Sequence, residues 1–262
     1  MSAVDLRELI AIVSFGVLAP WLSAPLAALF ARGRRLVAAL FVFALLAGLF
    51  IASYIFAKLS LPIEPPSSSL RLAAYGAIGG AIVSGAFLTH GPDAVIARAQ
   101  KLIETLVRAA GRIAIPLVGV MALLQFVAVI MRYVFGMNSI FVQESITYMH
   151  AASFMLAGGY ALLCGDHVRV DMLRRRMSER GCAVVDLGGT YFLLAPFVFI
   201  VLWASAPYVA TSFAIREGST EQSGIQAVFL LKSLIPAAAI LLAMAGFVAA
   251  VRAVHALNKM AA

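Results

Sequence analysis

The sequence predicts an all-α integral membrane protein with about seven transmembrane helices, and composition is the first reason. Of the 262 residues, 63% are hydrophobic and only 12% are charged. A soluble globular protein has roughly 45–50% apolar and about 25% charged residues. So little charge cannot cover a soluble core of this size, and the same figures exclude disorder and a disulfide scaffold. The second reason is the length of the apolar runs, because a spanning helix needs about 20 apolar residues.

Seven segments have the length and hydrophobicity of spans. They are approximately Leu9–Phe30, Leu36–Ala57, Leu70–Thr89, Ile113–Val134, Ile146–Cys164, Ala183–Phe213 and Ile225–Val251. The N-terminus lacks a basic region and a cleavage site, so the first run is expected to be a retained span and not a signal peptide. The sixth segment is too long for one straight crossing, and we expect Pro207 to mark where it bends or leaves the bilayer.

The segments between the spans predict the domain organisation. The polar run Leu61–Ser69 is expected to be a loop, and His90-Gly-Pro92 is expected to be a turn. Between the third and fourth spans, apolar residues recur at helical spacing with basic residues between them, which predicts an amphipathic helix in the membrane interface. The divisions are therefore an N-terminal three-helix extension (1–91), a basic linker helix (92–112) and a four-helix domain (113–262). Arg98 and Lys101 of the linker are candidates for contact with lipid headgroups.

The basic residues predict that the N-terminus lies outside and the C-terminus inside. Cytoplasmic loops of membrane proteins carry an excess of Lys and Arg. With this orientation most of the 20 basic residues fall on the inner side. They are Arg32, Arg34, Arg35, Arg98, Lys101, Arg108, Arg112, Arg169, Arg174, Arg175, Arg176, Arg180, Arg252 and Lys259. The net charge of +8 is thus explained by cytoplasmic loops without a nucleic-acid partner. Both cysteines fall on the same side, where thiols stay reduced.

The centres of the predicted spans contain few polar side chains. A chain that moves an ion needs ionisable groups along its path, but His150 and Gln125 are the polar exceptions at depth. Asp186 and Lys232 lie within about two helical turns of a span end. A haem would need paired histidines, and we expect His150 to be a hydrogen-bonded residue of the helix bundle. We therefore expect no complete transport site, no catalytic residue, no cofactor and no metal site in this chain.

The first stretch with a specific pattern begins at the outer end of the fourth span. Arg132 and Tyr133 are typical of an interfacial anchor pair. Phe141, Gln143 and Glu144 are expected in a short segment along the outer surface that turns into the fifth span. Glu144 has two interpretations: a favourable charge in the first turn of a helix, or a docking contact for a partner.

The second stretch runs from Gly165 to Arg180 on the inner side. Asp171 is expected to cap a basic helix that continues to Arg180. Arginines of this helix can meet anionic lipid headgroups; the candidates are Arg174, Arg175 and Arg176. In the alternative interpretation, His167, Arg169 and Asp171 fix a contact with another subunit.

The third stretch forms the outer loop and the start of the last span. It contains Pro207-Tyr208, Arg216-Glu-Gly-Ser219 and Phe229-Leu-Leu-Lys232-Ser-Leu-Ile-Pro236. Lys232 also has two interpretations, because its ammonium can snorkel to the headgroups or face an acidic group of a partner within the bundle.

In order and spacing, these stretches resemble the small permease subunit (the DctQ-like family) of tripartite ATP-independent periplasmic (TRAP) transporters. The family pattern has Arg-Tyr near the end of its first helix, an aromatic-x-acidic-acidic motif with a tyrosine four residues later, and a Gly-x-His-hydrophobic-Arg-Val-Asp run. The matching residues are Arg132-Tyr133, Phe141-x-Gln143-Glu144 with Tyr148, and Gly165-x-His167-Val-Arg169-Val-Asp171. Phe141 stands where tryptophan is common in the family, and Gln143 stands in place of the first acidic residue of the motif. These departures and the third stretch resemble the branch labelled for mannitol or chloroaromatic compounds.

The resemblance covers about residues 100–257 and implies a scaffold role in the bacterial inner membrane. In the family, the large permease subunit carries the substrate and sodium sites and moves as an elevator, while the small subunit braces it. A periplasmic binding protein delivers the substrate, usually an organic acid. The implied partners are therefore the large permease, the binding protein and phospholipids. The residues implied at partner contacts are Arg132, Tyr133, Phe141, Gln143, Glu144, Tyr148, His167, Arg169, Asp171 and Lys232.

The resemblance leaves out residues 1–95, whose three spans could enlarge the scaffold or pack against a neighbouring complex. Two other functions stay open from the residues. A stand-alone carrier or channel would need His150, Gln125, Lys232 and Asp186 to line one path, although they lie on different helices at unrelated depths. A haem or quinone anchor subunit of a redox enzyme is the second alternative.

Overall fold

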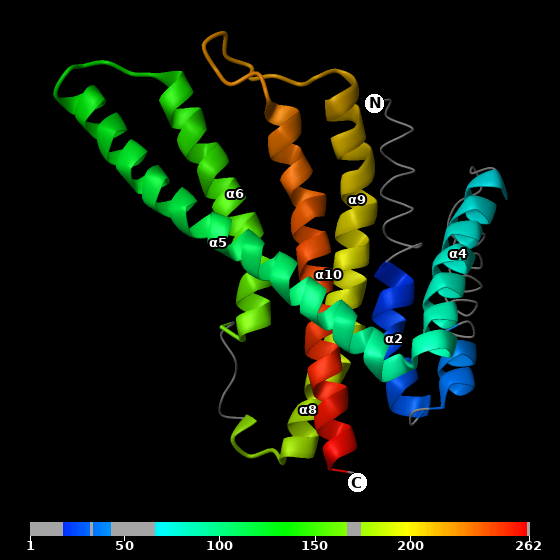
Figure 1. The fold of residues 1–262 in the computed structure, drawn as a ribbon. Coiled ribbons are helices and arrows are strands. Elements are labelled where there is room, and N and C mark those ends of the chain that lie inside the picture. Colours follow the sequence, from blue (N-terminus) through cyan, green and yellow to red (C-terminus); the bar gives the residue numbers. More distant parts are fainter. Residues whose placement is uncertain (1–17, 32–33, 43–65, 167–173, 261–262) are drawn as a thin grey trace. The chain divides into compact units, whose positions relative to one another are not determined.

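A computed structural model describes residues 18–31, 34–42, 66–166 and 174–260, with the backbone alone for residues 31 and 66–75. This part of the chain is helical, with turns and loops between the helices and no strand (Figure 1). The elements are α2 (Ala19–Ala31), α4 (Pro66–His90), α5 (Pro92–Tyr133), α6 (Ile140–Cys164), α8 (Glu179–Gly189), the π-helix η2 (Thr190–Leu194), α9 (Ala195–Ala214) and α10 (Val228–Lys259). The all-α class predicted from the sequence is confirmed.

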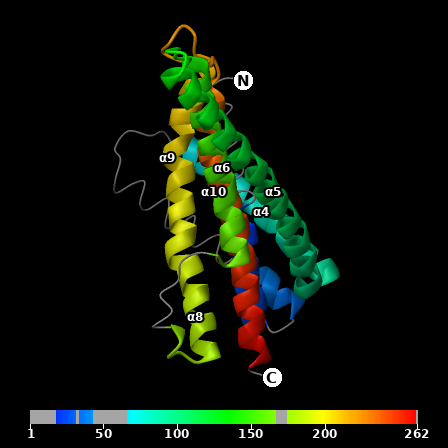
Figure 2. The same cartoon turned by 90° about the vertical axis from the view of Figure 1, so that its left-hand side faces the viewer.

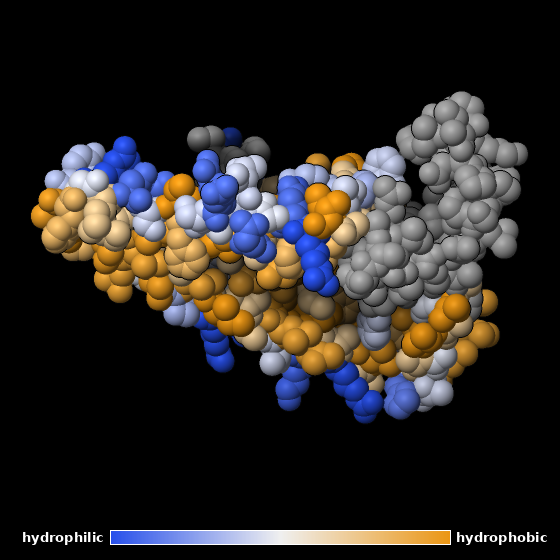
Figure 3. Space-filling model, turned by 90° about the horizontal axis from the view of Figure 1, so that it is seen from above, coloured by the Kyte–Doolittle hydropathy of each residue, from blue (hydrophilic) through white to orange (hydrophobic). Residues whose placement is uncertain are grey.

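Four helices in the described ranges are long and apolar enough to cross a membrane. They are Pro92–Tyr133, Ile140–Cys164, the continuous Glu179–Ala214 and Val228–Lys259. The surface seen in Figure 3 is largely apolar, as expected of helices that meet lipid. Two shorter apolar helices, Ala19–Phe30 and Gly76–His90, fall within the first and third predicted spans. The second span and the start of the first lie mostly outside the described residues, so the seven-span topology stays a prediction.

The connection between α4 and α5 is the turn expected at His90-Gly-Pro92. Gly91 has a φ of +82°, a left-handed conformation that glycine adopts without steric cost. The Arg35 guanidinium donates hydrogen bonds to the carbonyls of Leu88 and Thr89, both at 3.4 Å. The predicted loop Leu61–Ser69 was wrong at its end, because α4 already begins at Pro66. Proline suits the first position of a helix, where its missing N–H is not needed.

α5 joins two elements that the sequence predicts separately, the amphipathic linker (92–112) and the fourth span. It runs for 42 residues without interruption and contains Pro116. Proline is tolerated in transmembrane helices, and the helical spacing of the apolar residues continues from the linker into the span. The structure therefore has one long helix where two were expected.

α6 begins at Ile140, six residues before the predicted start of the fifth span. Ser139 has an extended backbone and its hydroxyl accepts a hydrogen bond from the Val142 N–H, which caps the helix. The expectation of a separate surface segment at Phe141–Glu144 was wrong, because these residues form the first turns of α6. At the other end Gly165, with a φ of +78°, closes the helix with hydrogen bonds to the last carbonyls.

The sixth predicted span is continuous from Glu179 to Ala214 but changes its hydrogen bonding in the middle. Five residues, Thr190–Leu194, form the π-helix η2, while the helix continues through Pro207 to Ala214. The predicted basic helix continuing to Arg180 is interrupted in its described part. Arg174 is helical and Arg180 belongs to α8, but residues 175–178 between them are not helical. The Ser178 hydroxyl accepts a hydrogen bond from the Gly181 N–H at 3.1 Å, which caps α8. The last span is shifted along the chain, to Val228–Lys259.

The chain divides into two compact units. Among the described residues, the first unit contains α5 from Glu104, α6, α9 from Pro196 and α10 up to Ala245. Figure 2 shows α6 and α10 side by side. A Cβ added at Gly159 of α6 would lie 2.9 Å from the Leu241 backbone oxygen, so glycine permits this close packing. Likewise, a Cβ at Gly111 of α5 would lie 2.4 Å from the Tyr160 ring.

The second unit contains α2, α4, α5 up to Ile103, α8, η2 and α10 from Gly246. The Tyr191 hydroxyl of η2 donates a hydrogen bond to the Leu22 carbonyl of α2 at 2.5 Å. The Trp21 ring meets the ring of Phe247 edge to face, with centroids 6.3 Å apart. Phe247 is 1% exposed. The N-terminal helix α2 is thus attached to two elements that follow it by more than 160 residues.

Candidate subunit-contact site

The loop between α9 and α10, residues 215–227, is attached to α6 by one carboxylate. Glu144 accepts a hydrogen bond from the Ser219 hydroxyl on one oxygen and from the Ile225 N–H on the other, the latter at 2.5 Å. The Ser219 oxygen also accepts from the Glu221 N–H at 3.1 Å. A Cβ at Gly224 would lie 2.7 Å from the Glu144 carboxylate, so a larger residue there would have to displace the Glu144 and Ser219 side chains. Glu144 therefore holds two points of the loop against the outer turns of α6.

The same loop is attached to α10 by an ion pair. The Lys232 Nζ lies 2.5 Å from a Glu217 carboxylate oxygen and 4.1 Å from the centre of the Tyr208 ring. The side chain of Lys232 is 16% exposed and that of Glu217 is 31% exposed. The hydrogen bond from the Lys232 ammonium lowers the pKa of Glu217 below its ordinary value. Lys232 therefore has an acidic partner within its own chain, and its contact with an acidic group of another subunit stays a prediction.

Aromatic residues surround these polar contacts. Phe213 at the end of α9 meets Phe229 at the start of α10, with ring centres 5.1 Å apart. Within the described part of the chain, the Tyr148 hydroxyl is buried and has no hydrogen-bond partner. Buried polar groups are nearly always paired, so an unpaired hydroxyl at this position is unusual.

We define the outer cluster as Glu144, Tyr148, Tyr208, Glu217, Ser219 and Lys232. These residues come from the outer turns of α6, from α9 and α10 near the loop, and from the loop itself.

The other residues of the first sequence stretch are exposed. Tyr133 at the end of α5 is 80% exposed and Phe141 is 57% exposed, and Arg132 is also exposed. Gln143 donates a hydrogen bond from its amide to the Asn138 side chain at 2.7 Å. Glu144 and Tyr148 thus face the chain itself, while their neighbours face outward. A partner contact at these exposed residues stays a prediction.

The second sequence stretch is only partly described. His167, Arg169 and Asp171 lie outside the described residues, so their role stays a prediction. Arg174, expected at the lipid headgroups, forms two hydrogen bonds with the Asp186 carboxylate, each 2.8 Å long.

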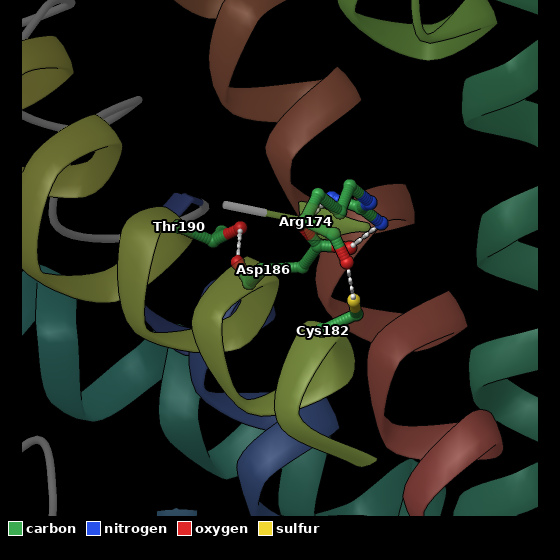
Figure 4. A network of polar contacts seen from close by, with 4 residues as sticks. All are labelled: Arg174, Cys182, Asp186 and Thr190. Carbon is green, nitrogen blue, oxygen red and sulfur yellow. Dashed lines mark hydrogen bonds and ion pairs between the residues drawn. The ribbon is translucent and has the colours of Figure 1, made fainter. Parts of the chain in front are cut away.

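The Arg174–Asp186 pair belongs to a small network in the second unit (Figure 4). The Cys182 thiol donates to the Arg174 carbonyl at 3.8 Å, and the Thr190 hydroxyl of η2 donates to the Asp186 carbonyl at 2.8 Å. The network joins the turn before α8 to the start of the π-helix. Arg175 and Arg176 beside it are exposed, as are Arg98 and Lys101 on α5, so contact of these four with lipid stays a prediction.

Of the four polar residues that a carrier would need, two form ion pairs within the chain and two are exposed. Lys232 binds Glu217, and Asp186 binds Arg174. His150, expected to be hydrogen-bonded inside the bundle, has an exposed side chain on α6, and Gln125 is exposed on α5. In the described ranges no group of three His, Cys, Asp or Glu residues is placed to hold a metal ion.

Sequence reasoning missed the loop partners Glu217 and Ser219. Both stand in the third stretch, on the predicted outer side together with Glu144 and Lys232. The signal available in the sequence was that Glu217 has the opposite charge to Lys232 and that the Ser219 hydroxyl can donate to the Glu144 carboxylate. The pairing was not predictable, because a loop of this length can reach several positions on either helix.

The family comparison agrees with the sequence resemblance. The family model described as Tripartite ATP-independent periplasmic transporters, DctQ component, matches residues 121–256. This range is just over half of the chain and extends from α5 almost to the end of α10. No curated protein and no solved structure matches the chain.

Proposed function

The chain belongs to the DctQ family of tripartite ATP-independent periplasmic transporters, and we propose that it acts there as a scaffold that braces the large permease subunit. It is the small membrane component of such a transporter, located in the inner membrane, and it is not an enzyme. The large permease and the periplasmic binding protein are the partners that the family implies. The proposal concerns how this chain contributes to uptake.

The observation that carries the scaffold role is the use of charge in the outer cluster. Glu144 and Lys232 are the family-type charged residues that we expected at a partner contact or in a path. Both instead bind the 215–227 loop of the same chain. A charged group that is fixed by its own chain holds structure in place and cannot at the same time release and rebind a solute. The substrate and coupling-ion sites then belong to the large permease, and an organic acid moved with sodium is the solute class that we propose.

The proposed topology has seven spans, with the N-terminus outside and the C-terminus inside. The excess of Lys and Arg in alternate loops supports it, and so does the length of the four long apolar helices. We also propose that the chain belongs to the branch labelled for mannitol or chloroaromatic compounds, on the evidence of Phe141 and Gln143. The N-terminal extension is proposed to enlarge the scaffold, because α2 contacts η2 and α10 of the same chain.

A mild-detergent pull-down of the tagged chain from its native membrane tests the proposal. We expect a large multi-span permease to be recovered at near-equal stoichiometry. The Arg132→Glu variant should recover less permease, because Arg132 belongs to the family-type Arg-Tyr pair and is exposed. Substrate affinity of the complex that still forms should not change. A chain that is recovered alone, and that drives uptake in liposomes without a second subunit, would contradict the scaffold role.

A further inference from the structure

One face of α6 carries polar side chains where lipid would be expected. The residues on it follow each other at alternating intervals of four and three, so they form a single stripe along the helix. We define the α6 stripe as Gln143, Thr147, His150, Phe154, Ala157, Ala161 and Cys164. The first four and the last are exposed, and the two alanines are half-buried. Gly159 and Leu163 on the opposite face are buried in the first unit, and so is Ser153 at the edge of the stripe.

The outer half of the α6 stripe is polar, with Gln143, Thr147 and His150. Within the membrane, a polar side chain that faces lipid raises the free energy of the folded chain. Counting from Glu144, which holds the outer loop, His150 lies about 9 Å further along the helix. Its imidazole would therefore stand within the membrane, where ionisable groups almost always face protein or water. Thr147 lies one turn above it. Its hydroxyl donates to the Gln143 carbonyl at 3.2 Å and keeps its own lone pairs as acceptors.

The inner half of the stripe is small. Ala157, Ala161 and Cys164 leave a shallow surface on which a second helix can come close, as small residues do at helix contacts in membranes. α6 is also the least hydrophobic of the four candidate spans. Phe154, which is 71% exposed, stands between the polar half and the small half. Polar and small residues along one face are typical of a helix-packing surface in membranes.

We propose that the α6 stripe binds a transmembrane helix of the large permease that carries hydrogen-bonding side chains at the depth of Thr147 and His150. The inference rests on the proposed function, and it names the surface through which the scaffold holds its partner. The stripe is continuous with the family pattern at Gln143, where the partner contact is expected. A second copy of the chain is the other possible occupant of the stripe, and an adduct between two copies would identify it.

Photo-cross-linking in native membranes tests this surface. A benzophenone amino acid at position 147 should form an adduct with the large permease. The matched control is position 204 of α9, where Ala204 is exposed among the apolar side chains Ile200 and Trp203; it should label lipid. An adduct with a second copy at position 147, or equal permease labelling at both positions, would overturn the proposal.

A steric variant provides the second measurement. Thr147→Trp should lower recovery of the permease by roughly tenfold or more, while Ala204→Trp should leave it unchanged. Both side chains are exposed in this chain, so both variants should elute as the same monodisperse species in detergent. If the unmodified chain captures the permease and Thr147→Trp captures it equally, the stripe is not the interface. If the unmodified chain captures no permease at all, the proposed function itself fails.

Discussion

At the scale of single residues, the Glu144 carboxylate holds the 215–227 loop at two points. In Glu144→Gln one oxygen remains to accept and the negative charge is lost, so both hydrogen bonds weaken. We expect several-fold faster cleavage of the loop in limited proteolysis of the detergent-purified chain. Glu221→Gln is the matched control, since Glu221 is exposed and its hydrogen bonds within the loop are made by its backbone N–H and carbonyl. Equal cleavage of the two variants would contradict the role given to Glu144.

The Glu217–Lys232 pair predicts a pH dependence of stability. The pKa of Glu217 is lowered in the folded chain by the Lys232 hydrogen bond, whereas an unfolded glutamate titrates at about 4.3. The stabilisation is therefore complete above that value and is lost as the pH falls through the lowered folded pKa. We expect Glu217→Gln to have a lower Tm than the unmodified chain at pH 7, and the difference to vanish in stronger acid.

Lys232 supplies the control for this titration. In a Lys232→Met background, Glu217→Gln should change Tm little at any pH, because the ammonium that favours the carboxylate is absent. A pH-dependent difference that persists in that background would show that another group sets the titration.

Single residues also show where the sequence stops being informative. The family-type spacing identified Glu144 and Lys232 as important, but it left their partners open between lipid, another subunit and the chain itself. The structure assigns both to the outer loop through Ser219, the Ile225 N–H and Glu217. Such contacts depend on how a loop returns across two helix ends, which no local pattern encodes.

At the scale of elements, α6 and α10 pack closely at Gly159. Gly159→Ala would place a Cβ 2.9 Å from Leu241, so the helices must separate. We expect a loss of about 1–3 kcal/mol, typical of an overpacked core, measured as a lower Tm in detergent. Gly158→Ala is the neighbouring control, because its Cβ would meet nothing within 4 Å. A smaller loss at Gly159 than at Gly158 would exclude the close contact.

The positions of the helices could be predicted where the length of an apolar run and a turn residue at its end indicate the same boundary. The turn at Gly91 and the four long apolar helices follow from residues visible in the sequence. The start of α6 was placed too late, because the polar residues Gln143 and Glu144 resemble a surface segment although Ser139 caps the helix before them. The π-helix at Thr190–Leu194 was not predicted, since a change from i+4 to i+5 hydrogen bonding leaves no mark in an apolar run.

At the scale of the whole molecule, the N-terminal helix α2 is attached to residues within the range 121–256 that the family model matches. The hydrogen bond from the Tyr191 hydroxyl to the Leu22 carbonyl is one such attachment. Tyr191→Phe should lower the stability of the full-length chain by about 1 kcal/mol, the usual net contribution of a hydrogen bond, measured by thermal unfolding in detergent. Tyr133→Phe is the control, since Tyr133 is 80% exposed. Equal effects of the two changes would argue against this attachment.

The length of α5 has a mechanical consequence. A helix of 42 residues is about 63 Å long, while the hydrocarbon core is about 30 Å thick. About half of α5 must therefore lean or run beyond the core, and that half carries Arg98, Lys101, Arg108 and Arg112. Cations at these positions can meet the phosphate layer at the edge of the core. A bilayer of different thickness would change the depth at which they meet it, so this subunit should be sensitive to the lipids around it.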